Sequence, residues 1–184
     1  MKRTNLPVIC LGLLLSCLPA IAEEHPANPG ETKSPEPATY QIRNQQYHEL
    51  LRPQDANGAT GTRLVLYAPQ PWKCMTWRLQ PAGGSAFRVQ NLFTAKTFMA
   101  DANTNRAQSV VQVSLKNDPT EAPTWQFTRL EDGTYKITDG KSGKVLTAAR
   151  SDHDRPVKIV VESWRNQDGQ KWELLKIDPK QLTM

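Results

Sequence analysis

Three short stretches of this sequence share one pattern: Met75-Thr76-Trp77-Arg78-Leu79, Pro123-Thr124-Trp125-Gln126-Phe127 and Gln170-Lys171-Trp172-Glu173-Leu174. In each stretch a tryptophan stands two residues before a large apolar residue. The three tryptophans are 48 and then 47 residues apart. A constant period of this size indicates a structural unit that occurs three times along the chain.

Other apolar positions follow the same period and divide each unit into short segments. Most of these segments alternate apolar and polar residues, which is typical of strands. One such unit would have a single apolar face and open edges, so three units must close on each other to bury that face. Four strands in each of three repeats of about 47 residues predict an all-β fold, a β-trefoil. The recurring positions are Tyr40-x-Ile42, Phe87-x-Val89 and Tyr135-x-Ile137; Leu51, Phe98 and Leu146; and Leu64-x-Leu66, Val111-x-Val113 and Ile159-x-Val161.

The expected trefoil domain covers residues 39–178, and glycine-rich turns divide it into the repeats 39–84, 85–132 and 133–178. Gly83-Gly84 ends the first repeat, and Asp132-Gly133, a strong turn signal, marks the next boundary. A short polar C-terminal tail, 179–184, follows. The tryptophans that carry the period, Trp77, Trp125 and Trp172, are expected to be core residues without a binding role.

The first 22 residues have the features of a secretory signal peptide. Lys2 and Arg3 precede an apolar run over residues 8–18, and Ala20-Ile21-Ala22 is a small-x-small cleavage site. The run is too short to span a membrane comfortably, so no transmembrane segment is expected. Cleavage after Ala22 predicts an exported protein, secreted or periplasmic, whose net charge falls from +5 to +3.

The same segment has an alternative interpretation. Leu14-Leu15-Ser16-Cys17 resembles a bacterial lipobox, in which lipid on Cys17 would anchor the protein to a membrane. Residues 23–38 contain four prolines, four glutamates and no large apolar residue, so we expect a disordered linker there. After cleavage at Ala22, Cys74 is the one remaining cysteine, and a small buried residue beside Trp77 is the favoured interpretation.

Catalytic and metal-binding patterns are not found in the sequence. No His and Cys residues have the spacing of a metal site, and no phosphate loop or nucleophile elbow is present. Asp152-His153-Asp154 is more typical of a solvated turn than of an acid-base cluster. The Lys and Arg residues are scattered, which argues against nucleic acid. We therefore expect a non-enzymatic protein without a cofactor.

The repeated tryptophan motif resembles that of the ricin-B-type lectin family of β-trefoils, which carries Gln-x-Trp in the last strand of each unit. The third unit has the motif as Gln170-Lys171-Trp172, whereas Pro123 and Met75 replace the glutamine in the other two. The resemblance covers residues 39–178 and implies a β-trefoil that binds sugars without catalysis. Each competent unit of the family uses an Asp, a Gln, an aromatic residue and an Asn.

The resemblance carries over only in part. The position of the Asp falls on Arg52, Met99 and Thr147, so no unit keeps it. The aromatic residue remains in the first unit as Tyr67, the Gln remains in the second unit as Gln112, and Asp101 lies two residues beyond the expected Asp. Trp72 and Trp164 lie outside the recurring core pattern and are candidate sugar platforms. The predicted carbohydrate-binding residues are therefore Tyr67, Trp72, Asp101, Gln112 and Trp164.

Two functions remain open at this point. The first is a secreted carbohydrate-binding module whose partner is a glycan or glycoconjugate. The second is a protein-interaction trefoil that has lost sugar binding and docks a protein partner, such as a toxin or an envelope component. The two aromatic platforms favour the first function, and the missing Asp favours the second.

Overall fold

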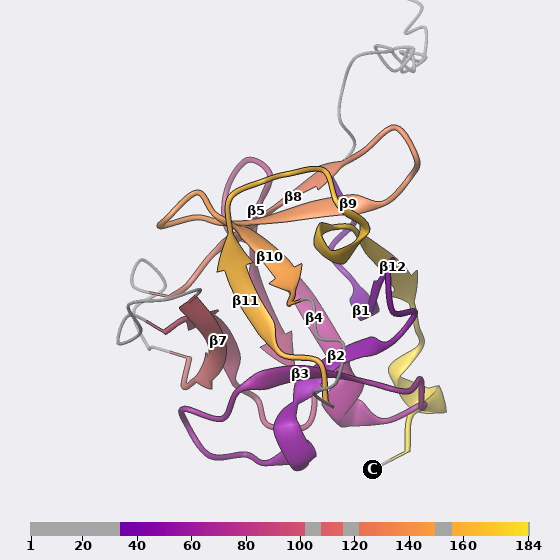
Figure 1. Cartoon of the computed structure of the whole chain (residues 1–184). Helices are drawn as coiled ribbons and strands as arrows, with labels where there is room; N and C mark the ends of the chain where they lie inside the picture. Colours follow the sequence, from indigo (N-terminus) through magenta and orange to yellow (C-terminus); the bar gives the residue numbers. More distant parts are fainter. Residues whose placement is uncertain (1–33, 102–107, 116–121, 150–155, 184) are drawn as a thin grey trace, which may run out of the picture. The chain divides into compact units, whose positions relative to one another are not determined.

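The computed structural model describes residues 34–101, 108–115, 122–149 and 156–183 (Figure 1). The signal peptide expected at 1–22, with Cys17, residues 23–33 of the linker and the turn Asp152-His153-Asp154 lie outside the described residues. The described strands are β1 (Thr39–Asn44), β2 (Leu50–Pro53), β3 (Leu64–Tyr67), β4 (Thr76–Pro81), β5 (Ala86–Asn91), β6 (Thr97–Ala100), β7 (Gln108–Val113), β8 (Trp125–Arg129), β9 (Tyr135–Asp139), β10 (Val145–Ala148), β11 (Ile159–Glu162) and β12 (Trp172–Lys176). Four short 3-10 helices accompany them: η1 (Gln54–Ala56), η2 (Lys73–Met75), η3 (Asp168–Gln170) and η4 (Pro179–Gln181).

The first and fourth strands of each unit form a closed barrel. Going round it, β1 pairs with β4, β4 with β5, β5 with β8, β8 with β9, β9 with β12, and β12 with β1. The second and third strands of each unit form the hairpins β2–β3, β6–β7 and β10–β11. This arrangement of six barrel strands and three hairpins confirms the predicted β-trefoil.

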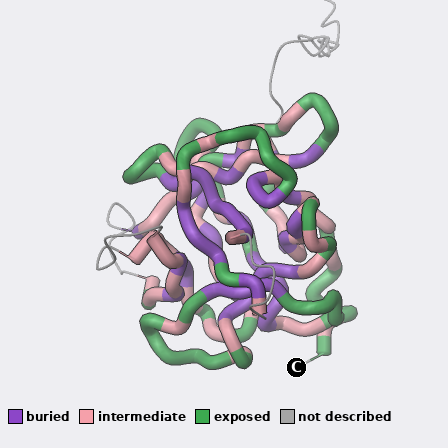
Figure 2. Tube along the Cα trace, viewed as in Figure 1, coloured by how far each residue is buried: buried purple, intermediate pink, exposed green. Residues whose placement is uncertain are grey.

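The core is built around the three periodic tryptophans, which are fully buried as predicted. Their burial leaves each indole N–H in need of an acceptor, and each finds one in the second strand of its own unit. The three indole hydrogen bonds run from Trp77 Nε1 to the carbonyl of Leu51 (3.0 Å), from Trp125 Nε1 to that of Phe98 (3.1 Å), and from Trp172 Nε1 to that of Leu146 (2.9 Å). Figure 2 shows the buried residues along the strands and the exposed ones mainly in the connecting turns.

A second threefold feature, which the apolar period does not reveal, lies at the end of the first strand of each unit. Asn44, Asn91 and Asp139 are buried there, and their side-chain oxygens accept hydrogen bonds from backbone N–H groups of the following turn. The amide nitrogens of the two asparagines also donate to residues just before the adjacent strand, at the carbonyls of Gly169 (3.1 Å) and Cys74 (2.9 Å). Asn44 and Asn91 therefore join their turns to a neighbouring unit, whereas the side chain of Asp139 bonds to residues of its own turn.

The second hairpin differs from the expected pattern by one residue. Val111-x-Val113 was expected to face the core, but Val110 and Gln112 do so and are fully buried, whereas Val111 and Val113 are only half-buried. A shift of one residue moves every side chain of a strand to the opposite face. Strand pairing shows which positions of the three hairpins are equivalent: Leu51 lies opposite Leu66, Phe98 opposite Gln112, and Leu146 opposite Val161.

Residues 34–38, the end of the expected linker, contact the trefoil. Pro35 is buried, and the carbonyl of Glu36 accepts a hydrogen bond from the hydroxyl of Tyr40 (3.0 Å). The carbonyl of Ala38 accepts one from the backbone N–H of Leu79 (2.9 Å). These five residues therefore belong with β1, because their backbone carbonyls accept hydrogen bonds from the trefoil even though their side chains offer little apolar surface.

Candidate functional site

Each hairpin has an inner face toward the core and an outer face. Directly opposed residues of antiparallel strands share a face, so the pairing defines the outer faces. The first-unit face is Leu50, Arg52, Val65 and Tyr67; the second-unit face is Thr97, Met99, Val111 and Val113; the third-unit face is Val145, Thr147, Val160 and Glu162. The family positions of the Asp and of the aromatic residue fall on the first-unit face, at Arg52 and Tyr67.

The loop that follows β3 covers the first-unit face. Leu50, Cys74 and Met75 form a small buried cluster, and Trp72 is half-buried against it. Burial raises the pKa of the Cys74 thiol, and the nearby Arg52 opposes this shift only in part. The loop therefore packs on this apolar cluster, and Trp72 remains partly exposed at the surface.

Tyr67 and Trp72, both predicted as sugar contacts, lie together on this face. Their ring centroids are 6.0 Å apart and their planes are inclined by 30°. Tyr67 is 39% exposed although it is a large aromatic residue. An exposed aromatic surface of this kind is suited to packing against the apolar face of a sugar ring.

Arg52 completes the first-unit face, and sequence reasoning treated it only as the loss of an acid. The residue is 8% exposed, and its guanidinium carbon lies 3.9 Å from the centroid of the Tyr67 ring. Its Nε atom is enclosed without a hydrogen-bond partner. The sequence offers one sign of this role: Arg52 is a charged residue within the otherwise apolar segment Leu50–Pro53, which indicates either a surface position or a specific contact.

The C-terminal tail, expected only as a polar extension, holds this loop in place. Trp72 forms a parallel bridge with Thr183. The backbone N–H of Lys73 donates to the carbonyl of Thr183 (3.1 Å), and the N–H of Thr183 donates to the carbonyl of Pro71 (2.7 Å). The backbone that carries Trp72 is therefore fixed on both sides.

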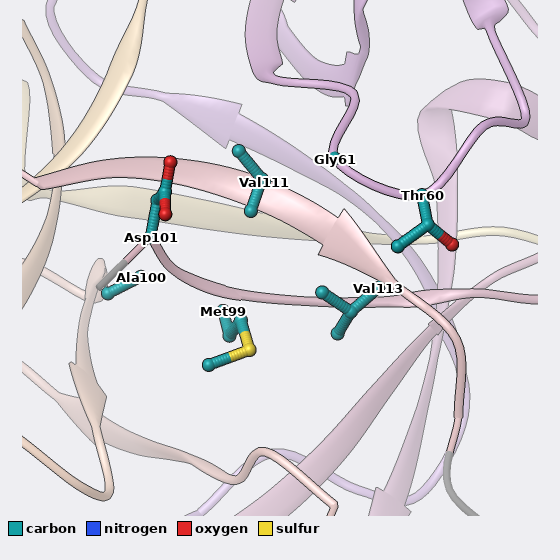
Figure 3. A pocket seen from close by; sticks show the side chains of 7 residues that line it. All are labelled: Thr60, Gly61, Met99, Ala100, Asp101, Val111 and Val113. Carbon is teal, nitrogen blue, oxygen red and sulfur yellow. The ribbon is translucent and has the colours of Figure 1, made fainter. Parts of the chain in front are cut away.

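The second-unit face forms a hollow instead of an aromatic platform. A pocket of about 340 Å³ is lined by Thr60, Gly61, Met99, Ala100, Asp101, Val111 and Val113 (Figure 3). Asp101, a predicted sugar contact, is one of these lining residues. Gln112 is not, because it lies on the inner side of β7, where its Nε2 donates to the carbonyls of Asn57 (2.6 Å) and Ala59 (2.7 Å). Its amide serves to hold the 57–61 loop.

The third-unit face is closed by the glutamine of the Gln-x-Trp motif. Gln170 Nε2 donates to the carbonyl of Ser163 (2.8 Å) and to Thr147 Oγ1 (3.3 Å), and Gln170 Oε1 accepts from the backbone N–H of Arg165 (2.7 Å). The half-buried Trp164 stands beside this closed loop, with Lys136 Nζ 5.5 Å from its ring centroid. Of the five predicted residues, the structure pairs Tyr67 with Trp72 and places the other three in separate surroundings.

In the described part of the chain, no three His, Cys, Asp or Glu side chains gather in a group that could hold a metal ion. Within the same residues, no helix has the length and apolar character needed to cross a membrane.

Comparison with known proteins supports the fold that carries the first-unit face. The family model described as ricin-type beta-trefoil lectin domain-like matches residues 121–183, which include the third unit and its Gln-x-Trp motif. The chain resembles the ricin-type β-trefoil lectins. No curated protein matches it in sequence. The match to the family model therefore rests on the part of the chain in which Gln170 closes the loop.

Solved structures show the same fold at low sequence identity. A designed threefold symmetric protein, ThreeFoil, has 21% identity and a TM-score of 0.68, and the match covers 76% of this chain and 99% of ThreeFoil. An exo-β-1,3-galactanase from Clostridium thermocellum has 20% identity and a TM-score of 0.68 over 79% of this chain, which spans 31% of the galactanase. The ricin B-like lectin of Macrolepiota procera, solved in complex with lactose, has 13% identity and a TM-score of 0.64, covering 79% and 100% of the two chains.

Proposed function

We propose that this protein is a non-catalytic lectin-like module that binds carbohydrate on its first-unit face. The observation that carries the proposal is the aromatic surface of Tyr67, 39% exposed and 6.0 Å from the Trp72 ring. This surface lies where the resemblance places the aromatic residue of a sugar site. The likeness to a lectin solved with lactose supports the same conclusion.

The expected affinity for one sugar is low. Stacking on one aromatic surface with a few hydrogen bonds typically gives a dissociation constant on the order of millimolar, or about −4 kcal/mol. Trp164, beside Lys136 in the third unit, offers a second and smaller aromatic surface. Contacts at two units on one polymer would raise the apparent affinity by avidity, so a polysaccharide is the favoured ligand.

The proposal can be tested with the chain lacking residues 1–22. A glycan array identifies a ligand, and tryptophan fluorescence then gives its affinity for the parent and for Tyr67→Ala and Trp72→Ala. Both variants should weaken binding about tenfold or more, because each removes part of the aromatic surface. Phe93→Ala is the matched control, since Phe93 is 46% exposed but lies outside the first-unit face. Equal affinity of the parent and of both variants would place the site elsewhere.

One observation favours a second candidate, a trefoil that docks a protein partner. The family Asp is absent from all three units, with Arg52, Met99 and Thr147 in its place. The array separates the two functions, because a protein-interaction trefoil would bind no glycan. Retention of one bound partner by the parent but not by Tyr67→Ala would then support docking on the same face.

We also infer that the protein is exported, by cleavage after Ala22 or, alternatively, with lipid on Cys17. The basis is the basic start and apolar run of residues 1–18. Mass spectrometry of the mature N-terminus distinguishes these routes. An N-terminus at Glu23 supports cleavage, an acylated Cys17 supports the lipoprotein, and an intact Met1 contradicts export by either route.

A further inference from the structure

Arg52 is a buried charge without an opposite charge. The residue is 8% exposed, and none of the described carboxylates forms an ion pair with it. Its Nε atom is enclosed and has no acceptor. Removing a cation from water is costly unless it is paired and hydrogen-bonded, so an Nε–H without an acceptor is unusual for a buried arginine. The guanidinium has the Cys74 thiol beside it, and Arg52 opposes in part the rise that burial causes in the pKa of that thiol.

The contact with Tyr67 compensates for only part of this cost. A cation at 3.9 Å from a ring centroid is attracted to the face of the ring, but this attraction does not replace hydrogen bonds to the N–H groups. The contact uses none of the five N–H donors of the guanidinium, which lie in the plane of the group. Because the Nε–H is enclosed, the terminal N–H groups of Arg52, which lie near Cys74, are the donors that an acceptor approaching the first-unit face would meet.

Packing of the hairpin does not require a charge at this position. The equivalent residues by strand pairing are Met99, opposite Val111, and Thr147, opposite Val160. Both are uncharged, and both hairpins form the same antiparallel pairing as the first. The guanidinium is thus a feature of the first unit alone, on the face that also carries the exposed aromatic surface.

The chemistry of Arg52 selects the class of sugar. An Asp at this position would accept hydrogen bonds from the hydroxyls of a neutral sugar, but arginine has donors only and accepts none. Its fork of N–H groups matches the two oxygens of a carboxylate, with which it forms paired, charge-assisted hydrogen bonds. A uronic acid residue presents a carboxylate beside a ring that also has an apolar face.

We propose that the first-unit face recognises a sugar that carries a carboxylate, with Arg52 binding the carboxylate and the Tyr67–Trp72 surface supporting the sugar ring. This inference rests on the proposed carbohydrate-binding function and specifies its ligand class. The reversal of charge relative to the family Asp thereby changes the selectivity of the site toward uronate-containing polysaccharides.

The decisive test compares two ligands on the unaltered protein. An oligogalacturonide and its fully methyl-esterified form have the same sugar rings, but only the first carries carboxylates. Isothermal titration at low salt should show the acid form binding about tenfold or more tightly. The difference should shrink in 1 M salt, where the Debye length is about 3 Å. A preference that depends on carboxylates in this way needs no variant to detect it.

Variants then assign the preference to Arg52. Arg52→Met places the residue of the second unit in the first, and it should abolish the preference while the ester still binds. Arg52→Lys should keep part of the preference, because a lysine retains the charge but not the fork. Arg129→Met, an exposed arginine of β8, is the matched control and should bind like the parent. If Arg52→Met does not melt cooperatively, the ligand pair on the parent still decides the question.

The outcomes separate the two proposals. Equal binding of acid and ester overturns the carboxylate inference and leaves carbohydrate binding standing. Binding to neither oligosaccharide nor to any array glycan overturns the proposed function, and the inference with it. Tighter binding of a sulfated oligosaccharide than of a uronate oligosaccharide would also overturn the assignment. Both ligands are negatively charged, and the proposal requires the site to prefer the carboxylate.

Discussion

The indole of Trp125 shows what each core tryptophan contributes to stability. Its ring centroid lies 4.8 Å from that of Phe98. The Phe98 ring also packs edge-on against Trp77, with 5.1 Å between the centroids, so this phenylalanine joins the first two units. The Trp125 N–H donates to a buried carbonyl. Removing such a ring leaves a cavity and an unsatisfied acceptor at the same time.

We expect Trp125→Ala to lower the free energy of unfolding by about 3–5 kcal/mol, the usual range for a large aromatic residue in a core. Trp125→Phe should cost less, because it keeps most of the ring and loses mainly the N–H donor. Urea unfolding followed by circular dichroism measures both. Gln126→Ala changes the exposed neighbour on the same strand and should have little effect. An alanine variant as stable as the parent would contradict the core assignment.

Cys74 should react slowly in the folded protein. Burial raises the pKa of its thiol, which keeps the reactive thiolate fraction low at neutral pH, and the buried cluster with Leu50 and Met75 blocks access. On the chain without residues 1–22, a thiol reagent such as DTNB should modify Cys74 far faster in denaturant than in buffer. Equal rates would show that the loop over the first-unit face is open in solution.

At the scale of elements, the turn after the first strand of each unit repeats closely. A backbone bond closes it, from the N–H of His48, Ala95 or Gly143 to the carbonyl four residues before. These three residues have positive φ values of 53°, 55° and 69°. This left-handed conformation costs a residue with a side chain roughly 1–2 kcal/mol, whereas glycine adopts it readily.

Glycine exchanges at these turns should therefore have opposite signs. Ala95→Gly should raise the free energy of unfolding by up to about 1 kcal/mol, after the extra flexibility of glycine in the unfolded chain is subtracted. Gly143→Ala should lower it by about 1 kcal/mol, since an added Cβ meets no atom within 4 Å and only the backbone is strained. Thermal melts of the two variants check this. The same sign for both would refute the argument from backbone conformation.

Periodicity predicted the strands and the trefoil because apolar side chains recur where the core requires them. It failed at Val111-x-Val113, because the run Val110-Val111-Gln112-Val113 has apolar residues at both parities and cannot define a register. It also missed the turn residues Asn44, Asn91 and Asp139, which recur at 47 and 48 residues. Their role is hydrogen bonding, which a search for apolar positions does not detect.

The candidate site was predictable to the extent that it is aromatic. Tyr67 and Trp72 stood out because large rings lie there outside or beside the core period. Arg52 did not, because its contact with Tyr67 joins residues on opposite strands, and the register of the hairpin must be known before the two are seen to meet. Arg52 is buried because the loop after β3 covers the first-unit face, and sequence spacing alone does not specify the path of that loop.

At the scale of the whole trefoil, the barrel closes where its first and last strands meet. β1 and β12 pair from Tyr40 opposite Lys176 to Asn44 opposite Trp172, and Arg43 forms an ion pair with Glu173 across the pairing (2.5 Å). Residues 34–38 extend this closure beyond β1. Lys176 also pairs with Glu36 (2.8 Å), and this hydrogen bond raises the pKa of the Lys176 amine. Both partners are exposed, so the ion pair itself adds little.

The extension should stabilise the trefoil as a whole, because it contacts β1 and β4 at the closure of the barrel. A chain that begins at Thr39 loses the acceptors for the Tyr40 hydroxyl and for the Leu79 N–H, together with the buried Pro35. With hydrogen bonds worth about 1 kcal/mol each and a further contribution from the apolar ring, we expect a loss of about 2–3 kcal/mol. Urea unfolding of chains that begin at Glu23, Ser34 and Thr39 measures this. The first two should be equally stable, and equal stability of all three would show that residues 34–38 are part of the linker after all.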